Sequence, residues 1–105
     1  MSDAITLTAP LTRWQGERGT YHLVVITGEP AEALAMHARL RRLEYGRHRG
    51  FGSLKVMARI GGTRWSTSVF PQAGSTEWIL LVSRKVKLAE GLSDGEPVHV
   101  ELDLA

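Results

Sequence analysis

The sequence contains no cysteine in its 105 residues. This absence excludes disulfide bonds, thiolate nucleophiles and cysteine-based zinc sites, and it fits a reducing compartment. The chain also lacks any run of roughly 18 apolar residues, the length that a membrane span needs. Its start, Met1-Ser2-Asp3, is polar and acidic, unlike the basic and then apolar start of an export signal. We therefore predict a cytoplasmic protein with no membrane association.

Motifs for catalysis or metal binding are also missing. The four histidines, His22, His37, His48 and His99, do not show the spacing of a known metal motif. The sequence shows no strained strand-to-helix turn of the kind that exposes a nucleophilic serine. The sequence thus predicts no metal, no cofactor and no catalytic residue. It favours binding over catalysis, and an enzymatic role stays open.

The composition predicts one folded domain. Hydrophobic residues make up 43% of the chain and charged residues 23%, which is typical of a globular protein, and 105 residues are too few for two independent cores. The net charge is only +2. However, eight basic residues lie between Arg39 and Arg64 against the single acid Glu44. This basic stretch either attracts a polyanion or consists of solvated surface charges.

Alternation of apolar and polar residues predicts six β-strands. They are Ile5–Leu11, Tyr21–Thr27, Ser53–Ile60, Thr63–Phe70, Thr76–Val82 and a last strand over residues 98–104. Continuous apolarity in the second and fifth strands predicts burial on both of their faces. The pair Gly61-Gly62 predicts a tight hairpin turn, since such turns often need positive φ at both central positions.

Two helices are predicted between these strands. The first runs from Pro30 to Leu43, and its apolar stripe is expected to pack on the sheet with Met36 as core filler. That stripe consists of Ala33, Leu34, Met36, Leu40 and Leu43. The second helix covers Arg84 to Glu90 and ends at the capping Gly91.

These elements predict a mainly β fold, a six-stranded closed or split β-barrel with two short capping helices. Closing the sheet buries every inward face and removes exposed edges. The interior of such a small barrel is filled by side chains. We therefore expect any ligand site on the outside, in a loop cleft or at an interface.

Four segments resemble the domain-of-unknown-function 1905 family. They are Gly50-Phe51-Gly52-Ser53-Leu54-Lys55-Val56, Ile60-Gly61-Gly62-Thr63-Arg64-Trp65, Thr67-Ser68-Val69-Phe70-Pro71 and Ala89-Glu90-Gly91-Leu92. The resemblance implies a small split β-barrel capped by helices, a fold grouped with swapped-hairpin transcription regulators and antitoxins, and it implies no established activity. The chain departs from the family at Leu80-Leu81-Val82-Ser83, where members often have Leu-Pro-Val-Lys, and at Gly95-Glu96-Pro97, where they have Gly-Asp.

Two segments supply candidate ligand-binding residues. The loop from Gly46 to Gly52 combines flexible backbone with positive charge, which suits an anion, although an ordinary mobile loop explains it too. The hydroxyl-rich segment after Trp65 is a second candidate, although cross-strand hydrogen bonds account for it as well. The tryptophans Trp14, Trp65 and Trp78 are mostly core candidates. The predicted ligand-binding residues are Arg47, Arg49, Trp65, Thr67, Ser68 and Arg84.

Three functions remain open from the sequence. The first is a non-enzymatic binding or scaffold module for an unknown ligand or protein partner. The second is nucleic-acid or anion binding through the stretch from Arg39 to Arg64. The third is a small enzyme or small-molecule-binding domain with a cleft near Trp65, Ser68 and Arg84. The oligomeric state is not predicted.

Overall fold

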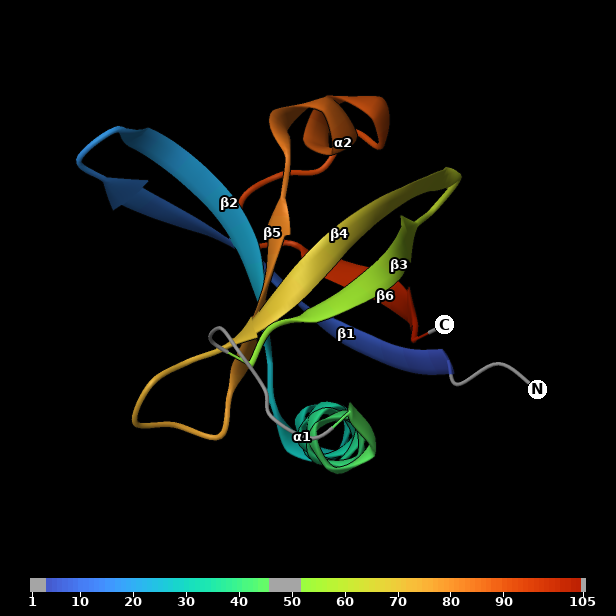
Figure 1. Ribbon diagram of the computed structural model, residues 1–105. Coiled ribbons are helices and arrows are strands. Elements are labelled where there is room, and N and C mark those ends of the chain that lie inside the picture. Colours follow the sequence, from blue (N-terminus) through green and yellow to red (C-terminus); the bar gives the residue numbers. More distant parts are fainter. Residues whose placement is uncertain (1–3, 46–51, 105) are drawn as a thin grey trace.

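The computed structural model describes residues 4–45 and 52–104, which form six strands and two helices (Figure 1). In chain order these are β1 (Ala4–Gly16), β2 (Gly19–Ile26), α1 (Gly28–Tyr45), β3 (Leu54–Ile60), β4 (Thr63–Pro71), β5 (Trp78–Val82), α2 (Arg84–Ala89) and β6 (Pro97–Asp103).

The six strands form a closed antiparallel barrel in the order β1-β2-β5-β4-β3-β6. Strand β1 takes part twice, because residues 4–10 pair with β6 and residues 11–16 pair with β2. The mainly β, six-stranded barrel is therefore confirmed, in its closed form. Closure pairs both sides of each strand, so no strand within the described residues is left as a sheet edge.

The core lies inside the barrel, where alternate residues of the strands meet. Its largest fully buried side chains are Leu11, Ile26, Leu34, Leu80, Leu102, Val24, Val69 and Val100. No polar or charged residue is buried among those that the structure describes. Hydrophobic burial thus holds the barrel together, and the predicted inward faces of the last strand and of β3 are confirmed.

Two neighbouring strand pairs of the barrel, β3 with β6 and β4 with β5, are hydrogen-bonded over short stretches only. Strands β3 and β6 pair over Met57–Arg59 only, and β4 and β5 pair from Val69↔Leu80 to Pro71↔Trp78. Beyond the pair Val69↔Leu80 the strands β4 and β5 separate, and α2 lies over that end of the barrel, on the side opposite α1 (Figure 1). This separation positions the candidate site described below.

Helix α1 is longer than predicted and buries a different stripe. Ala31 and Leu34 are buried, and Ala35 and Ala38 are half-buried against the core. These residues stand at i, i+3, i+4 and i+7, and three of the four are alanines that let the helix approach the sheet closely around the buried Leu34.

The predicted stripe of α1 is therefore wrong at three positions. Met36 and Leu40 are each 56% exposed, and Ala33 is exposed. The side chain of Leu43 lies outside the described ones.

Helix α2 and the tight turn at Gly61-Gly62 lie where the sequence predicts them, although only Gly61 of the pair has positive φ. The Oγ of Ser83 accepts a hydrogen bond from the Val86 N–H at 3.2 Å and so caps the start of α2. Gly91 follows the helix with φ +61°, and Gly61 opens the β3–β4 turn with φ +58°. Both are left-handed backbone conformations that residues other than glycine rarely adopt.

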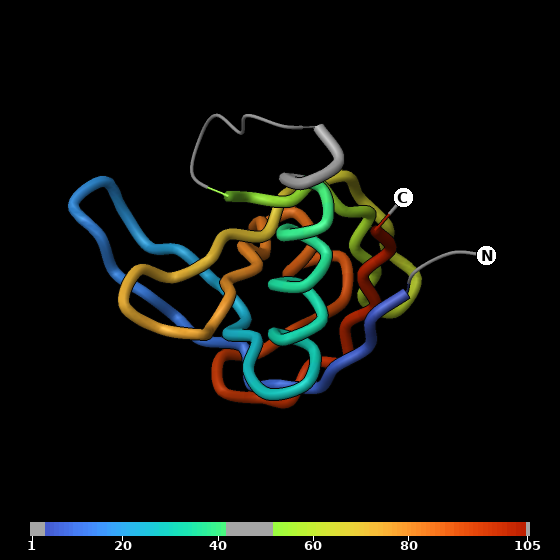
Figure 2. The backbone as a smooth tube through the Cα atoms, turned by 60° about the horizontal axis from the view of Figure 1, so that its bottom comes forward, coloured from blue at the N-terminus to red at the C-terminus, as the bar shows by residue number. Residues whose placement is uncertain are grey.

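The predictions for β1, β2 and β5 need correction. Strand β1 extends to Gly16, well beyond Leu11, because its second half forms a hairpin with β2 that leaves the core, so its apolar alternation stops there. This hairpin and the β4–β5 connection both extend beyond the same side of the barrel (Figure 2). The prediction that both faces of β2 and β5 are buried is wrong at Tyr21 and Leu81, which lie on the outer face and are 39% and 41% exposed, although Leu23 on the same face is buried.

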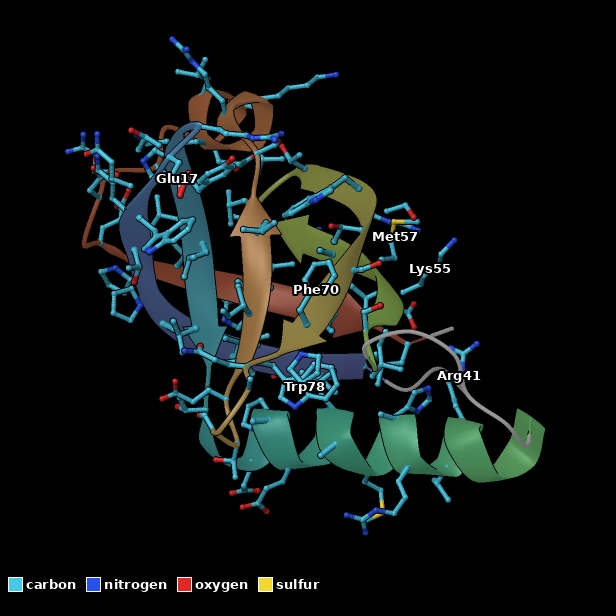
Figure 3. All side chains as sticks on the ribbon, turned by 60° about the vertical axis from the view of Figure 1, so that its left-hand side comes forward. Glu17, Arg41, Lys55, Met57, Phe70 and Trp78 are labelled. Atoms are coloured by element: carbon cyan, nitrogen blue, oxygen red, sulfur yellow. The ribbon has the colours of Figure 1, made fainter. Side chains whose placement is uncertain are left out.

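The tryptophans also divide. Trp78 is buried and lies on the side of the barrel that faces α1 (Figure 3). Trp65 is half-buried and packs against the core. Trp14 is 55% exposed, so its prediction as a core residue is wrong. Its strand projects past the end of the core, where only the surface of the hairpin is available to it.

Candidate functional site

A cleft opens where β4 and β5 separate. It has a volume of about 640 Å³ and lies between the upper part of β4, the end of β5, the start of β2 and helix α2. We call it the α2 cleft and define it by Thr20, Tyr21, His22, Trp65, Thr67, Leu81, Val82, Ser83, Arg84, Lys87 and Leu88. Pockets of about 300–1,000 Å³ are typical of small-molecule sites.

Strand β4 contributes two of the predicted ligand-binding residues to the α2 cleft. Trp65 and Thr67 share the inward face of β4 with Val69, and both are half-buried. Ser68 lies between Thr67 and Val69 in the sequence. It is therefore on the outer face of β4, where it is paired with Lys55 of β3. Successive residues of a strand point to opposite faces. The structure therefore brings Trp65 and Thr67 to the cleft and leaves Ser68 outside it.

Helix α2 contributes positive charge. Arg84 and Lys87 lie three residues apart, a spacing that places side chains on neighbouring parts of a helix surface, and both line the α2 cleft. Arg84 is exposed, and no described residue forms an ion pair with its guanidinium. The predicted Arg84 thus joins Trp65 and Thr67 at one site.

His22 lines the cleft, and it contacts Asp94, a residue outside the lining. The side chain of His22 is 15% exposed, and its Nε2 lies 2.9 Å from Asp94 Oδ1. This is an ion-pair distance, although the geometry of the two groups is not that of a hydrogen bond. The same oxygen is 3.5 Å from Lys87 Nζ. Asp94 therefore offsets part of the positive charge of Lys87, while Arg84 keeps its charge at the mouth.

The sequence analysis did not assign His22, Lys87 or Asp94 to a site. His22 has the same parity as Val24 and Ile26 on its strand, which was a signal for an inward position. Nothing in the sequence indicated that the turn carrying Asp94 would approach it.

A second contact fastens α2 to the β3–β4 turn. The hydroxyl of Thr63 donates a hydrogen bond of 2.5 Å to Glu90 Oε2, and the other carboxylate oxygen of Glu90 lies against Gly61. A Cβ added at Gly61 would collide with that oxygen. Two segments that carry the family resemblance, one around Gly61-Gly62-Thr63 and one around Glu90-Gly91, therefore meet at this contact. It fixes the helix above the cleft.

The predicted basic stretch does not form a face of one sign among the described residues. Arg47 and Arg49 lie outside them. Arg59 and Arg64 face each other across β3 and β4 on the outer surface, and Glu101 of β6 lies opposite Arg59 on the other side. Lys55 and Met57 also point outward from β3 (Figure 3). The outer surface of β3 and its neighbours thus carries both signs of charge.

Two general findings concern metals and membranes. In residues 4–45 and 52–104, no three His, Asp or Glu side chains gather as metal ligands. Neither described helix has the combination of length and apolarity needed to cross a bilayer. The cytoplasmic location stays a prediction.

The comparison with known proteins identifies a family. Among curated proteins, none matches the chain significantly. A family model described as a domain of unknown function, DUF1905, matches residues 8–102, which contain the α2 cleft and the contact between Thr63 and Glu90. This match covers nearly the whole chain and confirms the resemblance seen in its four segments. The chain therefore belongs to the DUF1905 family.

Proposed function

We propose that the protein is a non-enzymatic binding module that takes a small ligand in the α2 cleft. The ligand carries one anionic group attached to an apolar ring or chain. The observation that carries this proposal is the convergence of Trp65, Thr67 and Arg84 on one cleft, from a strand and a helix that are far apart in sequence.

The walls of the cleft support the apolar part of the ligand. Trp65, Val82 and Leu88 line it together with the outer residues Tyr21 and Leu81. Trp65 is half-buried, so one part of its indole ring packs on the core while another part stays accessible. An indole held in this way offers a flat surface on which a ring can stack.

The polar groups support the anionic part. Two cationic side chains line the cleft, and Lys87 is the one that contacts Asp94. No described residue forms an ion pair with Arg84, whose guanidinium can hold a carboxylate or phosphate with two hydrogen bonds. Thr67 and Thr20 add hydroxyl groups to the lining. A few polar groups placed on a mostly apolar wall are typical of ligand sites, because they fix the orientation of the ligand.

The hydroxyl and imidazole groups favour binding over chemistry. The Oγ of Ser83 is occupied as the cap of α2, and Nε2 of His22 faces the carboxylate of Asp94. Nucleophilic catalysis requires a hydroxyl within hydrogen-bond reach of a base. Thr8 Oγ1 and His99 Nδ1 do lie 3.1 Å apart, but this pair is on the exposed outer surface of β1 and β6 and lines neither the α2 cleft nor the opening between β4 and β5.

Three small probes test the proposal. Benzoate combines an anion with a ring, inorganic phosphate is an anion alone, and benzyl alcohol is a ring alone. We expect benzoate to bind more tightly than either of the others. The measurement is NMR of the three tryptophan indole N–H groups, and the signal of Trp65 should shift on addition of benzoate while those of Trp14 and Trp78 stay in place.

Variants on α2 sharpen this test. Arg84→Gln should weaken benzoate binding about threefold, since ion pairs at exposed positions contribute little. Lys85→Gln is the matched control, because Lys85 is exposed on the same helix and does not line the cleft. The proposal fails if the Trp65 signal does not shift at about 10 mM of any probe. It also fails if both variants bind benzoate equally well.

A further inference from the structure

An apolar groove covers the outer face of β2, β5 and β4. Leu23 lies opposite Leu81, Val25 lies opposite Ile79, and Ile79 lies opposite Phe70 in the strand register. Directly opposed residues on antiparallel strands share one face, so these side chains form a single floor. The groove has a volume of about 910 Å³ and is lined by strand and turn residues alone.

We call this surface the outer groove. Besides the floor, its lining consists of Thr12, Trp14, Gly16, Glu17, Arg18, Tyr21 and Gln72. Phe70 stands out from the centre of this face, and Glu17 lies at the far end of the β1–β2 hairpin (Figure 3). It borders the α2 cleft, with which it shares Tyr21 and Leu81.

The aromatic side of the outer groove is held in place. The rings of Trp14 and Tyr21 lie 5.6 Å apart, centroid to centroid, on paired positions of β1 and β2. The Trp14 ring also lies against Gly16, where an added Cβ would come 2.9 Å from the ring carbon Cζ3. Trp14 is nevertheless 55% exposed. A large ring that is already fixed loses little conformational entropy on binding, which is why such residues dominate the energy of protein interfaces.

The closed barrel restricts how a partner can bind this face. Strand addition needs an unpaired strand edge, whereas β2 and β5 pair with each other along the floor of the groove and each has a further paired neighbour, β1 for β2 and β4 for residues 78–80 of β5. A partner must therefore bind through side chains. Trp14, Phe70 and Leu81 are the exposed apolar side chains of this face, at 55%, 40% and 41%, and exposed apolar side chains that gather on one face are typical of interaction sites. Two sheets that pack face to face lie about 10 Å apart.

The charges of the outer groove favour a second copy of the chain. Within the part of the chain that the structure describes, the charged side chains that line it are Glu17 and Arg18, one of each sign, side by side at the tip of the β1–β2 hairpin. A two-fold interface brings the same patch of both copies together, so it must be complementary to itself. A two-fold axis can set Glu17 against Arg18 of the other copy, and the rest of the lining carries no charge that would repel its equivalent.

We infer that the outer groove is the interface of a two-fold dimer of this chain. The hairpin and the β4–β5 connection extend beyond the same side of the barrel (Figure 2), so the hairpin of each copy can reach over the groove of the other. Trp14 and Phe70 contact the opposing sheet in this dimer. Trp65, Thr67 and Arg84 of the α2 cleft lie outside the groove, whereas Tyr21 and Leu81 line both surfaces, so the interface touches the cleft only along this shared border.

Sedimentation velocity on the full chain tests the inference. From about 1 µM to about 1 mM, we expect a reversible shift from monomer to dimer. The double variant Trp14→Ala with Phe70→Ala should raise the dimer dissociation constant at least about tenfold. Leu40→Ala on α1 is the matched control, because Leu40 is as exposed as Trp14 but does not line the groove. Circular dichroism of each variant verifies that the barrel is folded.

A charge exchange tests the two-fold arrangement. Glu17→Arg alone and Arg18→Glu alone should each weaken their own dimer about threefold, because each gives the hairpin tip two like charges. A mixture of the two variants should form a heterodimer in preference to either homodimer. The inference is overturned if the wild-type chain stays monomeric throughout the range, if the Trp14 and Phe70 substitutions leave the dimer unchanged, or if the mixture shows no preference for the heterodimer.

Discussion

The α2 cleft and the outer groove lie side by side across β5, yet they are built in opposite ways. The cleft is enclosed by a helix that three contacts hold in position: the Ser83 cap, the bond from Thr63 to Glu90, and the ion pair of Lys87 with Asp94. The groove is a sheet face that no described helix covers. The difference teaches that the residues around the cleft are coupled to stability, whereas those of the groove are free to be used for binding.

The largest effect should come from the turn beneath Glu90. Gly61→Ala places a Cβ at φ +58° and against the Glu90 carboxylate, so we expect a loss of about 1–3 kcal/mol in the free energy of unfolding. Urea denaturation measures it. Gly62→Ala is the control, because its added Cβ would be 3.9 Å from the nearest Glu90 oxygen. Equal losses in the two variants would contradict the close contact at Gly61.

The hydrogen bond to Glu90 comes next. Thr63→Val removes the donor and leaves a part-buried carboxylate without its partner, which should cost about 1–2 kcal/mol. Thr63→Ser keeps the hydroxyl and should recover most of the loss. Combined with Gly61→Ala, Thr63→Val should cost less than the sum of the single changes, since both act through Glu90. If urea denaturation shows that the two losses of unfolding free energy simply add, the contacts at Gly61 and Thr63 do not act through the same carboxylate.

The cap of α2 should have a smaller effect. Ser83→Ala removes the acceptor for the Val86 N–H, and we expect about 1 kcal/mol of destabilisation. Ser83→Asp retains an acceptor and should stay near the wild type in a thermal denaturation experiment. If Ser83→Asp is as unstable as Ser83→Ala, the cap does not hold the helix.

The smallest effect should come from the outer groove. Trp14→Ala removes one exposed cross-strand partner of Tyr21, so we expect no more than about 0.2–1 kcal/mol at a concentration where the chain is monomeric. Urea denaturation in dilute solution measures it. A loss as large as that of Gly61→Ala would show that the groove, too, is part of the stabilising structure, and would remove the distinction between the two surfaces.

Prediction from the sequence succeeded where a local pattern sufficed. Alternation placed Val98, Val100 and Leu102 inside the barrel, and Gly61 and Gly91 were recognised as turn and cap positions because only glycine accepts their backbone conformation freely. Of the described candidate residues, Trp65, Thr67 and Arg84 reached one cleft. The positions of Arg47 and Arg49 lie outside the described residues.

Prediction failed where the answer depended on what covers a surface. Met36, Leu40, Trp14 and Leu81 were assigned to buried faces because they are apolar, and all four are substantially exposed. An apolar side chain reports a preference for burial, but it does not say whether a neighbouring element is available to bury it. Ser68 was predicted to share a cleft with Trp65 and Arg84, although its strand parity already placed it on the face opposite to that of Thr67.

The sequence by itself determined the number and order of the strands, the inward faces of β3 and β6, the start of α2 and the tight turns, because each depends on residues only a few positions apart. The tertiary structure decided that β4 and β5 separate beneath α2, that Thr63 meets Glu90 across 27 positions, and that the outer face of β2 and β5 stays uncovered. These outcomes depend on the order in which strands pair and on the space left between them, and no local pattern of residues contains that information.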